Sequence, residues 1–167
     1  MPKIRLKLVV AGGQTGADQG GLRAARSLHF PTGGYAPLGW LTEDGPAPWL
    51  ELWGLEECGV PGYAARTRAN AHLAGRKSGM LIWFGSRESR GCKATLKACE
   101  GLPIAKLFVV DGETTPRDAY RFIEACWVSP VLLVAGNRES LNPGISTRVE
   151  RFMTRVLTLV RAAQEAE

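Results

Sequence analysis

Short apolar runs alternate with longer stretches of helical periodicity along this chain, and that alternation constrains the fold more than any other feature. Runs with the length and composition of buried strands occupy 4–11, 79–84, 104–110 and 130–135. Stretches that predict helices occupy 17–28, 62–74, 93–100, 115–126 and 145–163. Strands that alternate with helices form parallel sheets. The sequence therefore predicts an α/β fold, a doubly wound and mostly parallel sheet with helices on both faces.

The last predicted helix has the clearest pattern. Its apolar side chains recur at i, i+4 and i+7 from Ile145 to Ala163, which predicts one buried face. The chain has 167 residues, close to the size of one domain, so we expect a single domain over residues 1–167. Residues 31–61 are rich in Gly, Pro and Trp and too long for an ordinary connection. They predict a functional loop or a packed surface excursion, with a backbone that the pattern leaves unassigned.

Composition narrows the class of protein. Apolar residues make up 45% and charged residues 22%, which is typical of a folded globular chain. No apolar run approaches the roughly 20 residues of a membrane span, and no signal peptide is visible. The net charge of +5 permits an anionic ligand but is too weak and dispersed to indicate nucleic acid. The 4 cysteines form no CxxC and no ligand spacing with histidine, so we predict reduced thiols, no metal site and a cytoplasmic protein.

The strongest local motif is a glycine-rich turn between the first predicted strand and helix. Its candidate ligand-binding residues are Gly12, Gly13, Gln14, Thr15, Gly16 and Asp18. Glycines let a backbone approach a ligand closely, and a helix N-terminus favours an anion, so the turn is a candidate phosphate site. It matches neither the Walker A loop nor GxGxxG. The alternative is a tight turn in which Thr15 or Asp18 caps the helix.

A second candidate group follows the strand at 130–135. It runs from Ala135 to Ser140, and its candidate ligand-binding residues are Gly136, Arg138, Glu139 and Ser140. Parallel strands place their carboxyl ends at one edge of the sheet, so this loop and the glycine-rich turn are expected to meet there. Arg138 could pair with an anion and Ser140 could donate to it, with Glu139 holding Arg138 in place. The alternative is a solvated turn with a salt bridge.

Two further polar groups are candidates: one lies on a predicted helix, and the other lies in the loop before the next predicted helix. Tyr63, Arg66, Thr67 and Asn70 share one helix face by their spacing, which fits either a ligand wall or an exposed polar face. Residues 85–92 carry basic and hydroxyl side chains that suit phosphate, although a flexible surface loop is the simpler interpretation.

Six segments in register resemble the molybdenum-cofactor carrier family, the circularly permuted YpsA-type branch of the SLOG superfamily of Rossmann-like ligand-binding domains. The matching pieces are Gly12 to Asp18, Gly33 to Pro37, Glu43 to Gly45, Tyr63 with Arg66, Thr67 and Asn70, Gly91 with Thr95, and Val134 to Gly136 with Arg138, Glu139 and Ser140. The resemblance implies a Rossmann-like fold and a homo-oligomer, a dimer or tetramer. It also implies an anionic ligand at the carboxyl edge of the sheet, either the molybdenum cofactor (molybdopterin) or a nucleotide-like molecule. On that analogy the first glycine-rich loop binds phosphate, Arg138 and Ser140 face it, and Tyr63, Arg66 and Asn70 line one wall.

The chain departs from the family pattern in its charges. Leu38 and the segment 40–42 stand where the family usually carries basic residues, and residues 64–87 contain no acid where an aspartate is usual. Gly91 is followed by Cys92 rather than threonine. Either a change of specificity or a weakened ligand site would follow, and Arg87, Arg90 or Lys93 could supply replacement charge.

Three functions fit these features. The first is a non-catalytic carrier or sensor of a phosphorylated pterin or nucleotide-derived molecule, because the loops converge without an evident nucleophile and base. The second is a SLOG-type N-glycosidase acting on nucleoside monophosphates, for which Asp18, Glu43, Asp44 and Glu139 are the available acids. The third is an interaction module for protein or nucleic acid, suggested by the pI of about 9.3 and by tryptophans 40, 49 and 53. Those tryptophans could instead pack the long loop onto the body or cover an oligomer interface.

Overall fold

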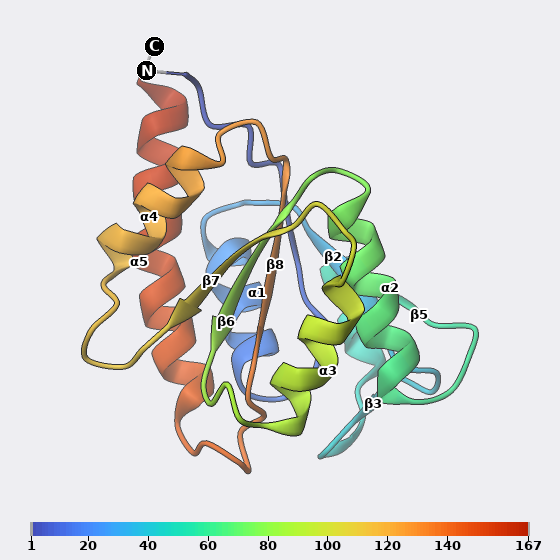
Figure 1. Cartoon of the computed structure of the whole chain (residues 1–167). Coiled ribbons are helices and arrows are strands. Elements are labelled where there is room, and N and C mark those ends of the chain that lie inside the picture. Colours follow the sequence, from blue (N-terminus) through green and yellow to red (C-terminus); the bar gives the residue numbers. More distant parts are fainter. Residues whose placement is uncertain (1, 167) are drawn as a thin grey trace.

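A six-stranded parallel sheet forms the centre of the computed structural model, which describes residues 2–166 (Figure 1). The strand order is β5-β2-β1-β8-β6-β7. The strands are β1 (Leu8–Val10), β2 (Thr32–Ala36), β5 (Leu55–Glu57), β6 (Met80–Phe84), β7 (Ala105–Val109) and β8 (Val131–Gly136). A two-stranded hairpin, β3 (Leu41–Thr42) with β4 (Gly45–Pro46), lies outside this sheet. The predicted α/β fold with a parallel sheet is confirmed.

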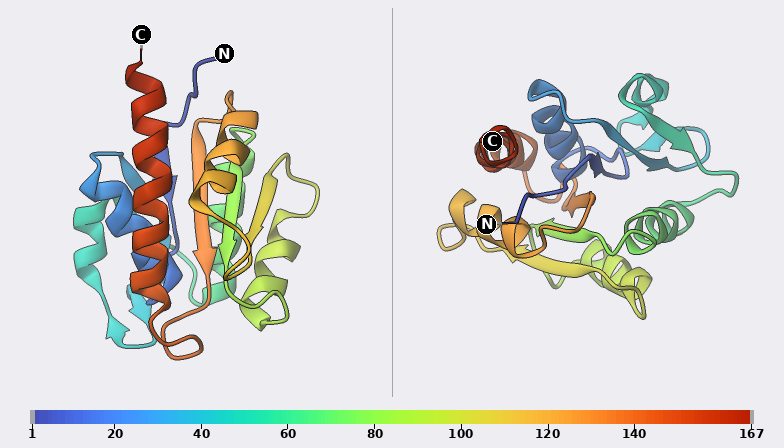
Figure 2. Two further views of the ribbon diagram at one scale, coloured as in Figure 1. Left: turned by 90° about the vertical axis from the view of Figure 1, so that its left-hand side faces the viewer. Right: turned by 90° about the horizontal axis from the view of Figure 1, so that it is seen from above.

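Helices cover both faces of the sheet (Figures 1 and 2). They are α1 (Ala17–Ser27), α2 (Tyr63–Gly75), α3 (Arg90–Cys99), α4 (Pro116–Ala125) and α5 (Ile145–Glu165), with a 3-10 helix η1 (Pro48–Trp53). α1, α4 and α5 lie on one face, and α2 and α3 lie on the other. No helix among residues 2–166 is both long enough and apolar enough to cross a membrane.

Alternate strand residues supply two separate cores. Val9, Ile82 and Leu132 are fully buried with the apolar faces of α1, α4 and α5. Their neighbours along the strands, such as Leu81 and Leu133, pack with α2 and α3. Side chains of successive strand residues point to opposite faces, so a sheet covered on both sides needs continuous apolar strands, as the sequence pattern predicted.

The first strand is shorter than predicted. Residues 4–11 form a single apolar run, but only Leu8–Val10 pairs with its neighbours in the sheet. Upstream, the chain lies against the segment before β8, where the amide of Arg5 donates to the Trp127 carbonyl and that of Lys7 to the Pro130 carbonyl. Ile4 and Leu6 are buried in the core that α1, α4 and α5 share, which explains the apolar run.

Residues 31–61 form a packed excursion with its own short elements. It contains β2, the β3–β4 hairpin, η1 and β5. Leu50 of η1 is fully buried with Leu22 of α1 and Leu55 of β5. Trp53 lies under the guanidinium groups of Arg23 and Arg26. The excursion is therefore fixed to α1 by apolar packing and cation–π contacts.

The carboxyl ends of the strands and the two chain termini lie at opposite ends of the molecule (Figure 2). The glycine-rich turn after β1, the loop from β6 to α3 and the loop from β8 to α5 all emerge at the carboxyl edge. Any site built from these loops is consequently remote from both termini.

Substitution of Gly13 tests how closely the excursion packs on the glycine-rich turn. Its φ is +80°, and a Cβ there would lie 2.7 Å from Cδ1 of Leu50. We expect Gly13→Val to lower the free energy of unfolding by roughly 2–4 kcal/mol, from backbone strain plus overpacking. Urea denaturation measures this. Gly39→Val is the matched control, because Gly39 has φ +82° with open space around it. An equal loss in both variants would show that Leu50 does not restrict this position.

Candidate functional site

A cavity of about 790 Å³ opens at the carboxyl edge of the sheet on the side of α2 and α3. That volume lies within the roughly 300–1,000 Å³ of small-molecule sites. Of the fifteen residues predicted for the site, eleven line it: Gly12, Gln14, Asp18, Tyr63, Arg66, Asn70, Gly91, Thr95, Gly136, Arg138 and Ser140. Thr67 lines it too, so the whole polar face of α2 is a cavity wall rather than a solvated surface.

Asp18 and Arg66 form an ion pair at the base of the cavity. Nη1 of Arg66 donates to Oδ2 of Asp18 at 3.2 Å and to the Gly12 carbonyl at 2.8 Å. The Gln14 amide donates to the same carboxylate oxygen at 3.2 Å. Burial raises the pKa of the Asp18 carboxyl, while the Arg66 charge and the amides of Gln14 and Gly12 act in the opposite direction. The Asp18 carboxylate therefore occupies the turn where a phosphate was predicted.

Gly12 must remain without a side chain because of this pair. A Cβ on Gly12 would lie 2.0 Å from Nη1 of Arg66. The glycine thus leaves room for a guanidinium from α2, so the close approach predicted for a ligand is made by Arg66 instead.

Gln14 joins the glycine-rich turn to the excursion and keeps a free donor. Its Oε1 accepts the amides of Thr15 at 3.0 Å and Glu43 at 2.9 Å. Its Nε2 has no hydrogen-bond partner within residues 2–166, although the side chain is only 8% exposed. Two N–H groups are therefore available to a ligand from a buried position on the cavity wall.

Glu43 fastens the loop after β8 to the turn after β1. Its carboxylate accepts the Thr15 hydroxyl at 2.5 Å and both the amide and the hydroxyl of Ser140. Burial alone would raise the pKa of Glu43, but these hydrogen bonds and the nearby Arg138 charge lower it overall. Ser140 lines the cavity, yet its donors are used by Glu43 rather than directed at an anion.

Four of the predicted residues do not line the cavity. Gly13 faces Leu50, and Gly16 lies against the backbone of the loop after β8, where a Cβ would be 2.4 Å from the Asn137 carbonyl. Thr15 is held by Glu43. The Glu139 carboxylate accepts the amides of Gly144 and Ser146 at 2.6 and 3.0 Å, so it caps α5 instead of holding Arg138.

Two asparagines fix the cavity walls. Asn70 forms a pair of hydrogen bonds with the backbone of Tyr35, accepting its amide at 2.8 Å and donating to its carbonyl at 3.0 Å. The side-chain oxygen of Asn137 accepts the Ser86 amide at 2.9 Å, and the backbone N–H of Asn137 donates to the Phe84 carbonyl. Asn137 was not predicted as a site residue, although it belongs to the polar loop after β8.

The N-terminus of α3 forms the opposite wall, where a flexible surface loop was the simpler prediction. Ser86, Ser89 and Arg90 line the cavity together with Gly91. Ser89 caps the helix by accepting the Cys92 amide at 3.2 Å, so the loop is ordered rather than flexible. Of the three basic residues named as replacements, only Arg90 reaches the cavity. Arg87 lies over the Phe108 ring at 3.8 Å, and Lys93 is exposed outside the lining.

Basic side chains surround Tyr63 at the cavity mouth. The guanidinium carbons of Arg66 and Arg138 lie 5.5 and 5.9 Å from the centre of its ring. Arg66 is paired with Asp18, but neither Arg90 nor Arg138 forms an ion pair with another described residue. The mouth therefore carries a net positive charge.

The thiols and acids of the described residues do not gather into a metal site. Among residues 2–166, no three His, Cys, Asp or Glu side chains are placed to hold a metal ion. The four cysteines are free, and Cys58, Cys92 and Cys99 are buried. Burial raises the pKa of the Cys92 thiol, which keeps it protonated and poorly nucleophilic at neutral pH.

Comparison with known proteins identifies the family. The model of the circularly permutated YpsA SLOG family matches residues 9–157. The chain belongs to this family. A similar solved structure is the "Putative molybdenum carrier protein" of Syntrophus aciditrophicus SB, at 29% identity and a TM-score of 0.79 over 93% of this chain and 97% of that one. A search of curated proteins found no match.

Membership of the circularly permutated YpsA SLOG family confirms the resemblance drawn from the six segments. The Rossmann-like arrangement extends over nearly the whole chain. Some residues of the family motifs do not line the cavity but have structural roles. Gly13 and Gly16 allow neighbouring segments to pack closely, and Glu139 caps α5.

The Glu43 clamp predicts a pH-dependent contribution to stability. Because the folded pKa of Glu43 is lower than its ordinary value of 4.5, the clamp stabilises the protein above that pH and is lost as pH falls through the folded pKa. We expect the free energy of unfolding to decline less steeply below about pH 5 in Glu43→Gln than in the unchanged protein. Chemical denaturation across a pH series measures it. Glu51→Gln alters an exposed carboxylate and serves as control. Identical pH profiles for all three proteins would rule out the clamp.

Proposed function

We propose that this chain is a carrier or sensor that binds a small phosphorylated anion, either a molybdenum-cofactor-like pterin or a nucleotide-derived molecule. The observation that carries the proposal is the 790 Å³ cavity with two guanidinium groups, Arg90 and Arg138, unpaired by any described residue. Arginines present several N–H donors in a planar fork that matches phosphate.

The anionic end of the ligand fits the wall made by α3. Arg90 and Gly91 begin this helix and line the cavity, so the positive end of the helix dipole lies beside it. Thr95, one turn further along, is only 8% exposed, and its hydroxyl has no hydrogen-bond partner within residues 2–166. Because Thr95 lines the cavity, this hydroxyl is free to donate a hydrogen bond to a ligand. These groups support a phosphate subsite at α3.

The uncharged end of the ligand fits the opposite wall. Nε2 of Gln14 offers N–H donors, and the Asp18 carboxylate can accept further hydrogen bonds besides those from Gln14 and Arg66. Pterins and nucleobases carry adjacent N–H and C=O groups on a flat ring. A ring edge of that kind would satisfy both Gln14 and Asp18, with the phosphate directed toward Arg90.

The molybdenum cofactor is supported as cargo by the name of the Syntrophus protein. Since no three His, Cys, Asp or Glu side chains gather for a metal among the described residues, we propose that such a cargo is held through its pterin and phosphate. The chain's own groups would then bind and orient it without a bond from protein to metal.

An N-glycosidase is less well supported by the cavity. Glycosidic cleavage generally uses two carboxylates that flank the bond. Asp18 is the one acid of the described chain that lines the cavity, and it is paired with Arg66. Glu43 and Glu139 serve as a clamp and a helix cap, and Asp44 is exposed outside the lining.

We also propose that the chain forms a homo-oligomer through its excursion. Leu52 is 81% exposed, and Leu38, Leu41 and Trp49 of the same segment are each at least 40% exposed. Apolar side chains gathered on one segment are typical of protein interfaces. Native mass spectrometry of the fresh protein reports the subunit number and any retained ligand together.

Substitution of the unpaired arginines tests the binding function. We expect Arg90→Ala and Arg138→Ala each to weaken binding of GMP or of isolated molybdenum cofactor by at least about tenfold, since a charge-assisted hydrogen bond contributes about 1.5–3 kcal/mol. Isothermal titration calorimetry measures the affinity. Lys93→Ala, on the exposed face of α3, is the matched control and should bind normally.

Three results would overturn the proposal. One is the absence of binding to every phosphorylated probe in the unchanged protein. Another is unaltered affinity in both arginine variants. The third is release of free base from a nucleoside monophosphate during incubation, which would show the enzyme instead.

A further inference from the structure

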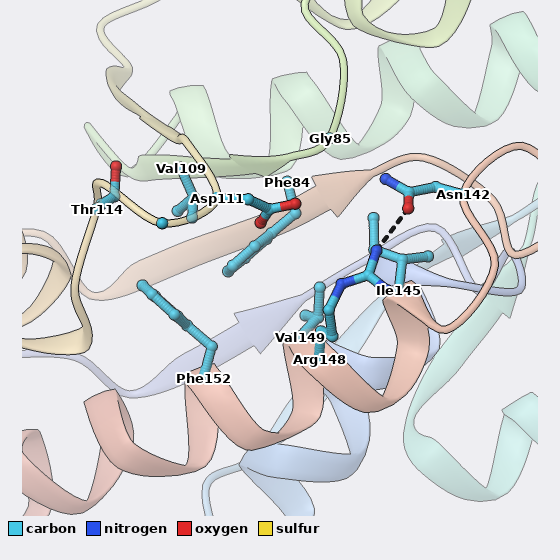
Figure 3. Close-up of a pocket in the computed structure, with 11 residues that line it drawn as sticks. Phe84, Gly85, Val109, Asp111, Thr114, Asn142, Ile145, Arg148, Val149 and Phe152 are labelled. Atoms are coloured by element: carbon cyan, nitrogen blue, oxygen red, sulfur yellow. Dashed lines mark hydrogen bonds between the residues drawn. The ribbon is translucent and has the colours of Figure 1, made fainter.

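A second, smaller cavity lies on the opposite face of the sheet, beneath the turn between β7 and α4 (Figure 3). Its volume is about 210 Å³, roughly seven times the share of one water molecule in the liquid. It is bounded by the ends of β6 and β7, the turn at 111–114, and the first two turns of α5. None of its lining residues belongs to the lining of the larger cavity.

The floor of this second cavity is apolar. It is made by Phe84, Val109, Ile145, Val149 and Phe152. The first four are buried, and the Phe84 and Phe152 rings meet edge to face at 5.3 Å. An occupant should therefore present an apolar or aromatic body to these side chains.

Opposite charges stand on the two rims. Asp111 comes from the β7–α4 turn and Arg148 from α5, and Figure 3 shows them on different sides of the cavity. No ion pair joins them, so their charged atoms are more than 4.0 Å apart. Each charge is thus left for another partner.

Arg148 is held in place at its rim. Its Nη1 donates to the Pro143 carbonyl at 3.0 Å and its Nη2 to Oδ1 of Asn142 at 2.5 Å. Gly144 leaves room for this arrangement, because a Cβ there would approach Nη1 to 3.0 Å. The guanidinium is therefore oriented in advance and still retains unused N–H donors.

We propose that this second cavity binds a small zwitterion with an apolar body, of the size and chemistry of a free amino acid such as leucine or phenylalanine. The ammonium group pairs with Asp111, the carboxylate pairs with Arg148, and the side chain contacts the floor. Both charges of the ligand are matched and its apolar surface leaves water, whereas a ligand with a single charge would leave Asp111 or Arg148 without a partner.

The zwitterion would act on the larger cavity through a shared wall. Gly85 lines the second cavity and its neighbour Ser86 lines the first. The Asn137 side chain fills the space beside Gly85 and accepts the Ser86 amide. Likewise Asn142 lines one cavity and Leu141 the other. An occupant that shifts these loops changes the first site, and linkage requires the effect to be reciprocal.

Amide chemical-shift mapping of the whole chain tests the second cavity. Titration with L-phenylalanine or L-leucine up to about 20 mM should shift the amides of Gly85, Gly112 and Thr114, with saturation in the millimolar range typical of small ligands. 2-Phenylethylamine and 3-phenylpropionate each lack one charge and should bind at least about fivefold more weakly. Asp111→Asn and Arg148→Gln should each weaken L-phenylalanine binding about tenfold.

Matched controls separate this site from general charge effects. Glu113→Gln and Arg151→Gln change exposed residues on the same turn and the same helix, and neither should alter the affinity. The spectra themselves report whether each variant is folded. The absence of shifts at these amides, equal binding of the singly charged analogues, or unchanged affinity in Asp111→Asn would overturn the proposal. Each of these results leaves anion binding in the larger cavity unaffected, so the two proposals fail independently.

Discussion

The hydrogen bonds of one guanidinium hold the site together. Arg66 reaches from α2 across the end of the sheet to the Gly12 carbonyl and the Asp18 carboxylate. The side chains of both charges are about nine-tenths buried, so losing either partner would leave an uncompensated charge away from water. This contact fixes α2 against the start of α1 and requires a glycine at position 12. The base of the larger cavity is consequently rigid before any ligand arrives.

The same contact moves the expected anion site. A helix N-terminus attracts negative charge, and at α1 that charge is supplied by Asp18, whose carboxylate accepts the Gln14 amide. A phosphate placed there would meet a carboxylate. At α3 the N-terminal turn is capped by the neutral hydroxyl of Ser89, with Arg90 beside it. Between the N-termini of α1 and α3, that of α3 is therefore electrostatically the better place for an anion.

Periodicity predicted the fold because it reports burial directly. Continuous apolar runs marked β6 and β8, and the stripe from Ile145 to Ala163 marked α5, since both faces of the sheet are covered. The segment 31–61 could not be predicted, because its strands have only two to five residues and its packing depends on Leu50 meeting distant Leu22. Polar spacing on α2 correctly gathered Tyr63, Arg66 and Asn70 on one wall. It could not show that Glu139 caps α5, because a carboxylate's partner depends on tertiary geometry.

The loop around Leu38 carries no basic residue, and Arg90 brings a positive charge to the opposite wall of the cavity. The excursion contributes a carboxylate near the mouth, since Glu43 is anchored to Ser140 and lies close enough to Arg138 for its pKa to be lowered by that charge. Part of the field of Arg138 is thereby offset on the excursion side. Arg90 stands on the opposite wall without an acidic partner among the described residues. The unpaired positive charges therefore lie at Arg138 and at the start of α3, and under the proposed function an anion held between them would leave the remainder of the cavity, toward Gln14 and Asp18, for an uncharged ring.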